Sequence, residues 1–317
     1  MQSYILNMNN EYKLAIMLCT YNGDEYLREQ IDSIISQDYD NWFLFVSDDG
    51  SKDATLEILN EYQRVLGQEK IIIAHGPKKG FAANFLNVMK NIPEDFGYYA
   101  FCDQDDIWLK DKLSTAVNVL KRDSASNKPQ VYCGRTTLVD ENNKLIGESP
   151  LFRKKPNLRN ALVQSIAGGN TMVLNRQAFN MVKCTPEECD IVSHDWWVYI
   201  LICAANGDVI YDPESKIRYR QHTKNLVGSN TGWMARCLRL KGLLKGKLKG
   251  WNQKNINALL HMDEFISSDN KDILNCFIVG RDSGFFKRTY ILLKLRLYRQ
   301  TLVGSIALLL AILLNKI

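Results

Sequence analysis

Residues 97–108 have the sequence GYYAFCDQDDIW, in which an apolar run leads directly into a cluster of acids. A short apolar run of this kind predicts a buried β-strand. Asp103, Asp105 and Asp106 follow it within four residues, with Gln104 between the first two. Carboxylates this close together repel one another unless a cation is near. The stretch therefore predicts a buried strand that ends at a site in need of positive charge.

Strands and helices are predicted to alternate along the first part of the chain. Apolar runs typical of strands lie at 14–19, 42–47, 70–75 and 97–102, and helical patterns follow them at about 26–35, 54–62, 81–90 and 110–121. This alternation predicts an α/β fold with a mostly parallel sheet, flanked by helices and joined by right-handed crossovers. In such sheets ligands bind at the carboxyl ends of the strands.

Polar groups follow each of the four predicted strands, so the four strand ends are expected to face one ligand. Tyr21 can stack on a nucleobase, and a carboxylate can accept hydrogen bonds from a base or a ribose. Lysine and a helix N-terminus suit a diphosphate. Each cluster could instead be a turn that caps the next helix. The candidates for nucleotide binding are Cys19, Thr20, Tyr21, Asn22, Asp48, Asp49, Lys79, Gly80 and Asn84.

Asp103 and Asp105 are the candidate metal ligands in the acidic cluster. Mg²⁺ prefers oxygen ligands and usually binds through one or two carboxylates together with substrate phosphates. Because the two residues alternate across a strand end, one can face the metal and the other a ribose or a second partner. The alternative is a solvated acidic loop, and Asp106 can equally be a cap of the following helix.

The segment 123–232 is less regular than the part before it. It contains a predicted pair of short strands joined by a turn at 140–143, a loop that enters a strand at 167–176, an apolar helix at 194–207 and a strand at 216–222.

Two polar motifs in this segment contain candidate residues. In HDWW, Asp195 is either a helix cap or a general base partly desolvated by indole, and Trp196 and Trp197 could offer an apolar face to a sugar ring. In YRQH, Arg220 and His222 could hold a diphosphate or its metal. The alternative for His222 is a structural histidine.

The composition excludes several other classes of protein. The 317 residues are 46% hydrophobic and 24% charged, which is ordinary for a globular protein. None of the eight cysteines forms a C-x-x-C pair, which favours buried thiols in a reducing cytosol over disulfides, and the four histidines are not spaced as zinc ligands. Neither a Walker-type nor a G-x-G-x-x-G phosphate loop is present, and the N-terminal residues do not resemble a signal peptide.

Charge is distributed unevenly along the chain. Residues 233–317 contain 15 Lys and Arg against 5 Asp and Glu, whereas residues 1–232 contain 25 and 30. We expect a catalytic domain at 1–232, followed by a basic helical tail at 233–317 that attaches peripherally to an anionic membrane. The alternatives are a helical subdomain or a dimer surface. Nucleic acid is not expected as the partner, because leucines are interleaved with the basic residues.

The leucine-rich run at 302–314 is the most apolar part of this tail. Its 13 residues are fewer than the roughly 20 that a membrane span needs. The run is therefore expected either to lie in a membrane interface or to pack as a helix.

The ordered set C-T-Y-N, D-D-G-S, K-K-G-F-A-A-N, D-Q-D-D-I-W, G-G-N-T-M, H-D-W-W and Y-R-Q-H resembles glycosyltransferase family 2. The resemblance covers roughly residues 12–230, and the combination carries it rather than any single motif. It implies the GT-A fold and an inverting transfer of sugar from a nucleotide-sugar, assisted by Mg²⁺ or Mn²⁺. D-Q-D-D-I-W and Y-R-Q-H are most similar to rhamnosyltransferase-like members that build bacterial cell-surface polysaccharides, such as O-antigen or capsule. Such a member is expected to use a dTDP- or UDP-linked sugar and a lipid-linked saccharide acceptor, in the cytoplasm at the inner face of the membrane.

The resemblance also implies roles by position. The nucleotide pocket is matched by Cys19, Tyr21, Asp48, Asp49, Gly80 and Asn84. The loop beneath the donor sugar and the acceptor is matched by Gly169, Asn170 and Thr171. Asp103 and Asp105 match the D-x-D motif, with Asp105 as the direct metal ligand, and Asp195 matches the catalytic base.

Two positions depart from the family's pattern. Cys19 stands where proline is more frequent, which should change little because backbone groups can make the contact. His194-Asp195 stands where Glu-Asp is more frequent, so the second carboxylate is kept and the role of the preceding residue is open.

Two other functions compete with this interpretation, and an oligomer is compatible with all three. A sugar nucleotidyltransferase usually has a Gly-rich basic loop after the first strand, which CTYNGDEYL lacks. A non-catalytic sugar-nucleotide or polysaccharide-binding module would not need carboxylates at both Asp105 and Asp195.

Overall fold

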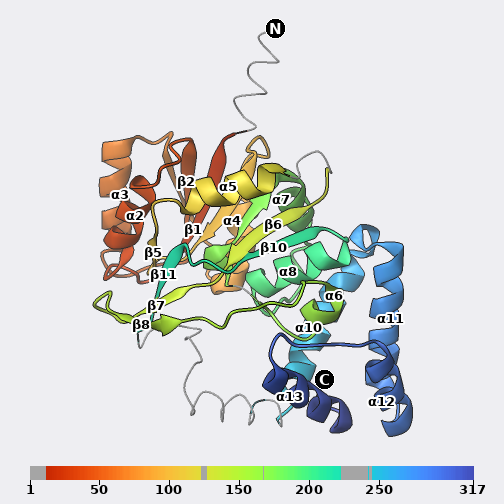
Figure 1. Cartoon of the computed structure of the whole chain (residues 1–317). Helices are drawn as coiled ribbons and strands as arrows, with labels where there is room; N and C mark the ends of the chain where they lie inside the picture. Colours follow the sequence, from red (N-terminus) through yellow and green to blue (C-terminus); the bar gives the residue numbers. More distant parts are fainter. Residues whose placement is uncertain (1–11, 123–126, 167, 223–241, 243–244) are drawn as a thin grey trace. The chain divides into compact units, whose positions relative to one another are not determined.

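The structure is a computed structural model that describes residues 12–122, 127–166, 168–222, 242 and 245–317 (Figure 1). These residues cluster into two compact units. Unit 1 consists of the described residues of Met1–Pro150, Ala167–Cys184 and Ile210–Gly228, and unit 2 of those of Leu151–Ile166, Thr185–Val209 and Ser229–Ile317. The predicted domain boundary at residue 232 lies outside the described residues and stays a prediction.

Unit 1 is built on a mostly parallel sheet, as predicted. Among the described residues it has seven strands in the order β10-β6-β9-β4-β1-β2-β3. Strand β1 lies between β2 and β4 and is parallel to both, and β2 is parallel to β3, whereas β9 is antiparallel to β4 and to β6. The strands are β1 Leu14–Thr20, β2 Trp42–Asp48, β3 Ile71–His75, β4 Tyr98–Cys102, β6 Gln130–Gly134, β9 Val173–Asn175 and β10 Asp208–Asp212.

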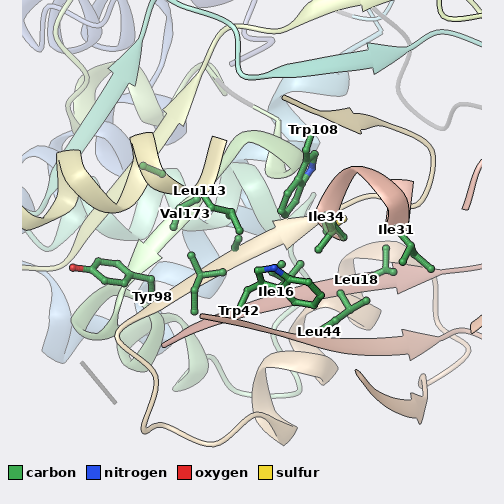
Figure 2. Packing of buried hydrophobic residues seen from close by; sticks show 14 of the residues in the cluster. Ile16, Leu18, Ile31, Ile34, Trp42, Leu44, Tyr98, Trp108, Leu113 and Val173 are labelled. Carbon is green, nitrogen blue, oxygen red and sulfur yellow. The ribbon is translucent and has the colours of Figure 1, made fainter. Parts of the chain in front are cut away.

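Helices follow the four parallel strands where the apolar periodicity places them. They are α2 Leu27–Ile35, α3 Thr55–Leu66, α4 Phe81–Asn91 and α5 Lys112–Arg122. Alternate residues of a strand point to opposite faces of the sheet. Ile16, Leu18 and Leu44 thus pack in a cluster with residues of α2, α3 and α5, such as Ile31 and Leu113 (Figure 2).

The residues between these positions point to the other face of the sheet. There Phe101 packs edge-on against Phe85 of α4, and Tyr99 stacks on Phe179 of α7 (Arg176–Lys183). The buried sheet therefore carries helices on both faces, and its carboxyl edge is left for the loops.

A smaller sheet in unit 1 continues from the acidic loop. Its order is β5-β11-β7-β8, formed by β5 Ile107–Trp108, β11 Ile217–Arg220, β7 Thr137–Val139 and β8 Leu145–Glu148. The predicted turn at 140–143 joins β7 to β8, with Asn143 N donating to Asp140 O at 3.0 Å. Strand β5, where we expected only the approach to a helix, pairs antiparallel with β11. The acidic loop 103–106 is therefore held between a strand of each sheet.

Unit 2 is helical, which confirms the predicted helical C-terminal region. Its helices include α6 Leu158–Ala161, α8 His194–Ala204, α10 Lys247–His261, α11 Ser268–Asp282, α12 Phe285–Lys294 and α13 Leu302–Leu313 (Figure 1). Nearly every residue of α8 is buried. None of the helices in the described part of the chain is both long enough and apolar enough to cross a membrane.

Candidate active site

The loop after β1 presents an exposed aromatic ring on a fixed backbone. The Tyr21 side chain is 57% exposed. Its backbone N–H donates to Gln104 Oε1 at 2.9 Å, and Gln104 Nε2 donates to Tyr21 O at 3.1 Å. A Cβ at Gly23 would lie 2.3 Å from Gln104 Oε1, so a larger residue there would displace the amide that makes these two bonds. Gln104, to which the sequence assigned no role, thus joins the acidic loop to the candidate base-stacking residue.

Asn22 and Thr20 brace the same loop against the end of β2. Asn22 Oδ1 accepts from Lys52 N at 2.9 Å, and Asn22 N donates to Ser51 Oγ at 2.9 Å. Thr20 Oγ1 donates to Asp48 Oδ2 at 2.9 Å. Asn22 has a φ of 47°, in the left-handed region that asparagine tolerates well.

The two aspartates at the end of β2 shape neighbouring loops. Asp48 is buried, and its Oδ1 accepts from Gly50 N at 3.1 Å and Ser51 N at 2.9 Å. Asp49 accepts from Lys78 N at 2.5 Å and from Gly80 N at 2.9 Å. Asp49 therefore ties the end of β2 to the loop that enters α4.

Asn84 is hydrogen-bonded to Ser47 of β2 within unit 1. Ser47 Oγ donates to its Oδ1 at 2.6 Å, and its Nδ2 donates to Ser47 O at 2.8 Å. Lys79 is exposed, and Gly80 begins α4 at a φ of 87°, which favours glycine.

The carboxyl ends of β1, β2 and β4 converge on Cys19. Burial raises the pKa of the Cys19 thiol well above its usual value, and the nearby charges of Asp103 and Asp49 raise it further. The strand pairing shows the same meeting, because Cys19 is paired with Ser47 of β2 and Leu18 with Cys102 of β4. The structure thus brings together residues that the sequence places 30 and more positions apart.

Asp106 is an internal anchor, and its interpretation as a helix cap was wrong. It is fully buried, and it accepts from Asn170 Nδ2 at 2.6 Å and from Arg220 N at 3.1 Å. Burial raises the pKa of Asp106 well above its usual range, and Asp105 and Asp103 raise it further. Asp106 thus fastens the acidic loop to β11 and to Gly169–Thr171, the turn that the resemblance placed beneath the donor sugar.

Arg220 lies buried behind the acidic loop. Its Nε donates to Asp105 O at 3.0 Å and one terminal nitrogen to Glu141 O at 2.7 Å, while the other pairs with Glu29 of α2. The guanidinium also lies 4.5 Å from the ring centroid of Tyr26. Arg220 is therefore a brace for this loop, and its predicted contact with a diphosphate stays a prediction.

Asp105 and His222 form a pair at the front of the loop. His222 Nε2 lies 2.9 Å from Asp105 Oδ2, and both side chains are mostly buried. Asp103 is partly exposed beside them. The sequence proposed these three residues as metal ligands, and the structure brings Asp105 and His222 into direct contact.

The donor set around Asp105 fits a metal that is shared with a diphosphate. Among the described residues, no group of three or more His, Cys, Asp or Glu side chains is arranged to hold a metal by itself. Mg²⁺ usually takes one or two carboxylates and completes its coordination with water and substrate phosphates. Asp105, with Asp103 or His222 beside it, offers that partial set.

A buried lysine supplies positive charge beneath the acidic loop. Lys112 is buried, and its Nζ lies 3.8 Å from the ring centroid of Trp108. Burial lowers the pKa of Lys112 to about 8, against the raising effect of Cys102, Asp106 and Asp103. Lys112 was assigned no role from the sequence, because a lysine at the start of a predicted surface helix is expected to be exposed.

Asp195 begins α8 in unit 2. Its Oδ1 accepts from Trp196 N at 2.7 Å, and its side chain is partly buried. Burial lowers the pKa of the adjacent His194 to about 4. Trp196 and Trp197 are buried and donate to Ala161 O and Thr185 Oγ1 within unit 2. The expectation that these indoles offer a face to a sugar was therefore wrong.

Comparisons with known proteins identify the family. The family model described as glycosyl transferase family 2 matches residues 15–182. The chain is 30% identical over 266 residues to the dTDP-rhamnosyl transferase RfbG of Shigella flexneri, an alignment that covers 79% of this chain and 87% of that relative.

Two solved structures are similar in fold. TarS 1–349 of S. aureus, in complex with UDP-GlcNAc, has a TM-score of 0.53 at 14% identity and covers 90% of this chain and 89% of that chain. The mannosyltransferase PcManGT of Pyrobaculum calidifontis, in complex with GDP-Man and Mn²⁺, has a TM-score of 0.50 at 15% identity and covers 96% of this chain and 85% of that chain. At these identities the likeness shows the fold alone, and the fold is the predicted GT-A type. Because the family model spans more than half of the sequence and RfbG is similar over most of its length, the chain belongs to glycosyltransferase family 2.

Proposed function

We propose that the chain is an inverting, metal-dependent glycosyltransferase. It would move a hexose, with rhamnose as the first candidate, from a dTDP- or UDP-linked donor to a hydroxyl of a lipid-linked saccharide. The observation that carries the proposal is that the carboxyl ends of the neighbouring strands β1, β2 and β4 meet, with the Asp105–His222 pair in the loop that follows β4. The similarity to a dTDP-rhamnosyl transferase supports the choice of donor.

In this proposal the nucleotide lies along the strand ends. Tyr21 stacks on the base, because its ring is exposed while Gln104 holds its backbone. Asp103 and Asp105, with His222, hold a divalent metal together with the donor diphosphate. The metal, when bound, neutralises charge that develops on the leaving diphosphate, so no general acid is required.

Asp195 is the proposed general base. It removes the proton from the acceptor hydroxyl, whose oxygen then attacks the anomeric carbon on the side opposite the diphosphate. The transition state has oxocarbenium character, as in glycoside hydrolysis, and the single displacement inverts the anomeric configuration. Burial keeps His194 neutral at pH 7, so it adds no positive charge beside the base.

The base is tested with the variant Asp195→Asn, and Asp190→Asn is the matched control. Asp190 is an exposed aspartate of the same unit that pairs with Lys254. We expect D195N to bind the nucleotide normally and to lose transfer by about 10²–10⁴-fold, the usual contribution of general-base catalysis. D190N should transfer sugar at the wild-type rate. Normal transfer by D195N would show that another group is the base.

A panel of nucleotide-sugars, beginning with dTDP-rhamnose and UDP-hexoses, would identify the donor. The measured quantity is release of nucleoside diphosphate with and without Mn²⁺ or Mg²⁺. A non-catalytic binding module would release none, and a sugar nucleotidyltransferase would need a nucleoside triphosphate and release pyrophosphate. Release that persists in a chelator would contradict the metal requirement.

The proposal includes peripheral attachment to the inner face of the cytoplasmic membrane through residues 233–317. A lipid-linked acceptor lies in that membrane, and each Lys or Arg near an anionic surface contributes about 1 kcal/mol to binding. The net charge of this segment supports the idea.

A further inference from the structure

Unit 2 leaves an apolar stripe of α13 exposed. Residues three, four or seven positions apart share one side of a helix, and the exposed apolar residues of α13 follow this spacing. Leu302 is 77% exposed and Ile306 is 53% exposed, whereas the opposite side, with Leu308 and Ile312, is buried. The stripe consists of Leu302, Val303, Ile306, Leu309, Leu310 and Leu314.

Helix α12 packs against α13 and adds exposed apolar and aromatic side chains. Phe286, the most exposed of them, is 84% accessible. The full set on α12 is Phe285, Phe286, Tyr290 and Leu293. We call these residues and the stripe on α13 together the α12–α13 apolar surface. Many exposed apolar side chains on two helices that pack together are typical of an interaction site.

Buried arginines hold α13 in this orientation. Arg288 of α12 is buried, and its Nε donates to Ile312 O at 2.9 Å. Arg281 of α11 is also buried, and its Nε donates to Ile317 O at 3.1 Å. The first bond adds a side-chain donor to a carbonyl in the last turn of α13, and the second ties the residues that follow α13 to α11. Turning the stripe inward would break them, so the exposure of the leucines is built into the packing.

The positive charge around the α12–α13 apolar surface indicates that its partner is anionic. Residues 283–317 contain six Lys and Arg and no Asp or Glu. Lys287 and Lys294 are exposed on α12 itself. A basic amphipathic helix with leucine and aromatic residues binds anionic lipid interfaces. A second copy of the chain would instead bring like charges together, which is unfavourable.

We propose that the α12–α13 apolar surface docks in the headgroup region of an anionic lipid bilayer, with Lys287 and Lys294 on the lipid phosphates. Helix α13 has 12 residues and is therefore about 18 Å long, shorter than the roughly 30 Å hydrocarbon core, so it lies along the interface. The inference rests on the proposed function, because it names the part of 233–317 that meets the membrane of the lipid-linked acceptor.

The test uses the full chain, because Arg159 Nε and Asn160 Nδ2 in the segment 151–166 bond carbonyls of Leu295 and Tyr298, so a truncation would also disturb unit 2. Co-sedimentation is measured with phosphatidylcholine vesicles that contain or lack phosphatidylglycerol. The wild type should bind the anionic vesicles, and Val303→Glu/Ile306→Glu should weaken that binding at least about tenfold.

Two further variants separate the apolar from the electrostatic contribution. Lys287→Gln/Lys294→Gln should weaken binding several-fold and reduce its dependence on salt. Val65→Glu on α3 is the matched control, since it places a glutamate on an apolar residue that is 83% exposed in unit 1, and it should bind as the wild type does. If V303E/I306E does not give the wild-type unfolding midpoint, Ile306→Gln replaces it.

Donor hydrolysis in solution separates this inference from the proposed function. Metal-dependent diphosphate release that is unchanged in V303E/I306E, together with lost vesicle binding, supports both. Equal vesicle binding by V303E/I306E and the wild type would overturn the docking surface, whatever the hydrolysis assay gives. The docking surface would also be overturned if the wild type formed a dimer that does not bind vesicles and that the V303E/I306E substitutions dissociate.

Discussion

Buried charged side chains stabilise different kinds of surface in the two units of the molecule. In unit 1, Arg220 and Asp106 are buried behind the acidic loop, and their bonds hold Asp105 in place beside His222. In unit 2, Arg281 and Arg288 are buried and donate to backbone oxygens in and after the last turn of α13, and apolar side chains of that helix are left exposed. Burying a charge is costly unless its partners are well placed. The contrast shows that one buried network shapes a polar ligand site and the other presents an apolar surface.

The largest expected effect is at Arg220. Arg220→Ala removes a guanidinium that pairs with Glu29 and donates to Asp105 O and Glu141 O. A hydrogen bond to a charged group contributes about 1.5–3 kcal/mol, so the loss of these bonds, one of them to a half-exposed Glu29, should lower the free energy of unfolding by about 3–5 kcal/mol. Denaturant titration measures it. Because the loop loses its brace, the affinity for Mn²⁺ in the presence of nucleoside diphosphate should fall as well.

Arg218→Ala is the matched control on the same strand. Arg218 is exposed and donates to Asn143 Oδ1 at 3.1 Å, so its loss should cost less than about 0.5 kcal/mol. Equal effects of R218A and R220A would mean that the network behind the acidic loop does not stabilise unit 1, and the contrast between the units would disappear.

The sheet and the neighbourhood of the site were predictable because they depend on local patterns. Four apolar runs and their following helices place β1 to β4 within a few residues, and the polar clusters lie at one edge because parallel strands end together. The role of Asp106 was not predictable in this way, since its partner Arg220 lies 114 positions away. A side chain that is fixed by long-range contacts looks, in the sequence, like a turn or a cap.

The burial of Lys112 and Arg220 escaped prediction for a related reason. Both charges are buried because strand β5 pairs with β11, and β5 has only two residues, too few to show a periodic pattern. In unit 2 the stripe on α13 was visible as a leucine-rich run, but the run alone could not show which side is exposed. That side depends on tertiary contacts, among them the bond from Arg288 to Ile312 O in the last turn of α13.

The next effect concerns His194 in unit 2 and appears as a pH dependence. The pKa of His194 is about 4 in the folded chain, against about 6.5 for an unperturbed histidine. Between pH 6.5 and 4, His194 is protonated in the unfolded chain but stays neutral in the folded chain. Stability from this group is therefore complete above pH 6.5 and falls by about 3 kcal/mol as the pH drops to 4.

His194→Gln should remove this part of the slope, whatever it does to the absolute stability. The measurement is the difference between the wild-type and variant free energies of unfolding at several pH values from 7 to 4. His261→Gln, at the exposed end of α10, is the control and should give the wild-type slope. Parallel curves for H194Q and the wild type would mean that His194 is not buried in its neutral form.

The smallest effect tests how unit 2 keeps its apolar surface outside. Arg288→Ala removes a side-chain donor from Ile312 O, at 2.9 Å, and from Ser283 O, at 3.1 Å, and should lower the free energy of unfolding by about 2 kcal/mol. Lys287→Ala, the exposed neighbour, should lower it by less than about 0.5 kcal/mol. Without Arg288, α13 is free to turn its leucines inward, so R288A should also bind anionic vesicles more weakly than K287A does. If R288A kept full vesicle binding at reduced stability, the arginine would stabilise unit 2 without orienting α13.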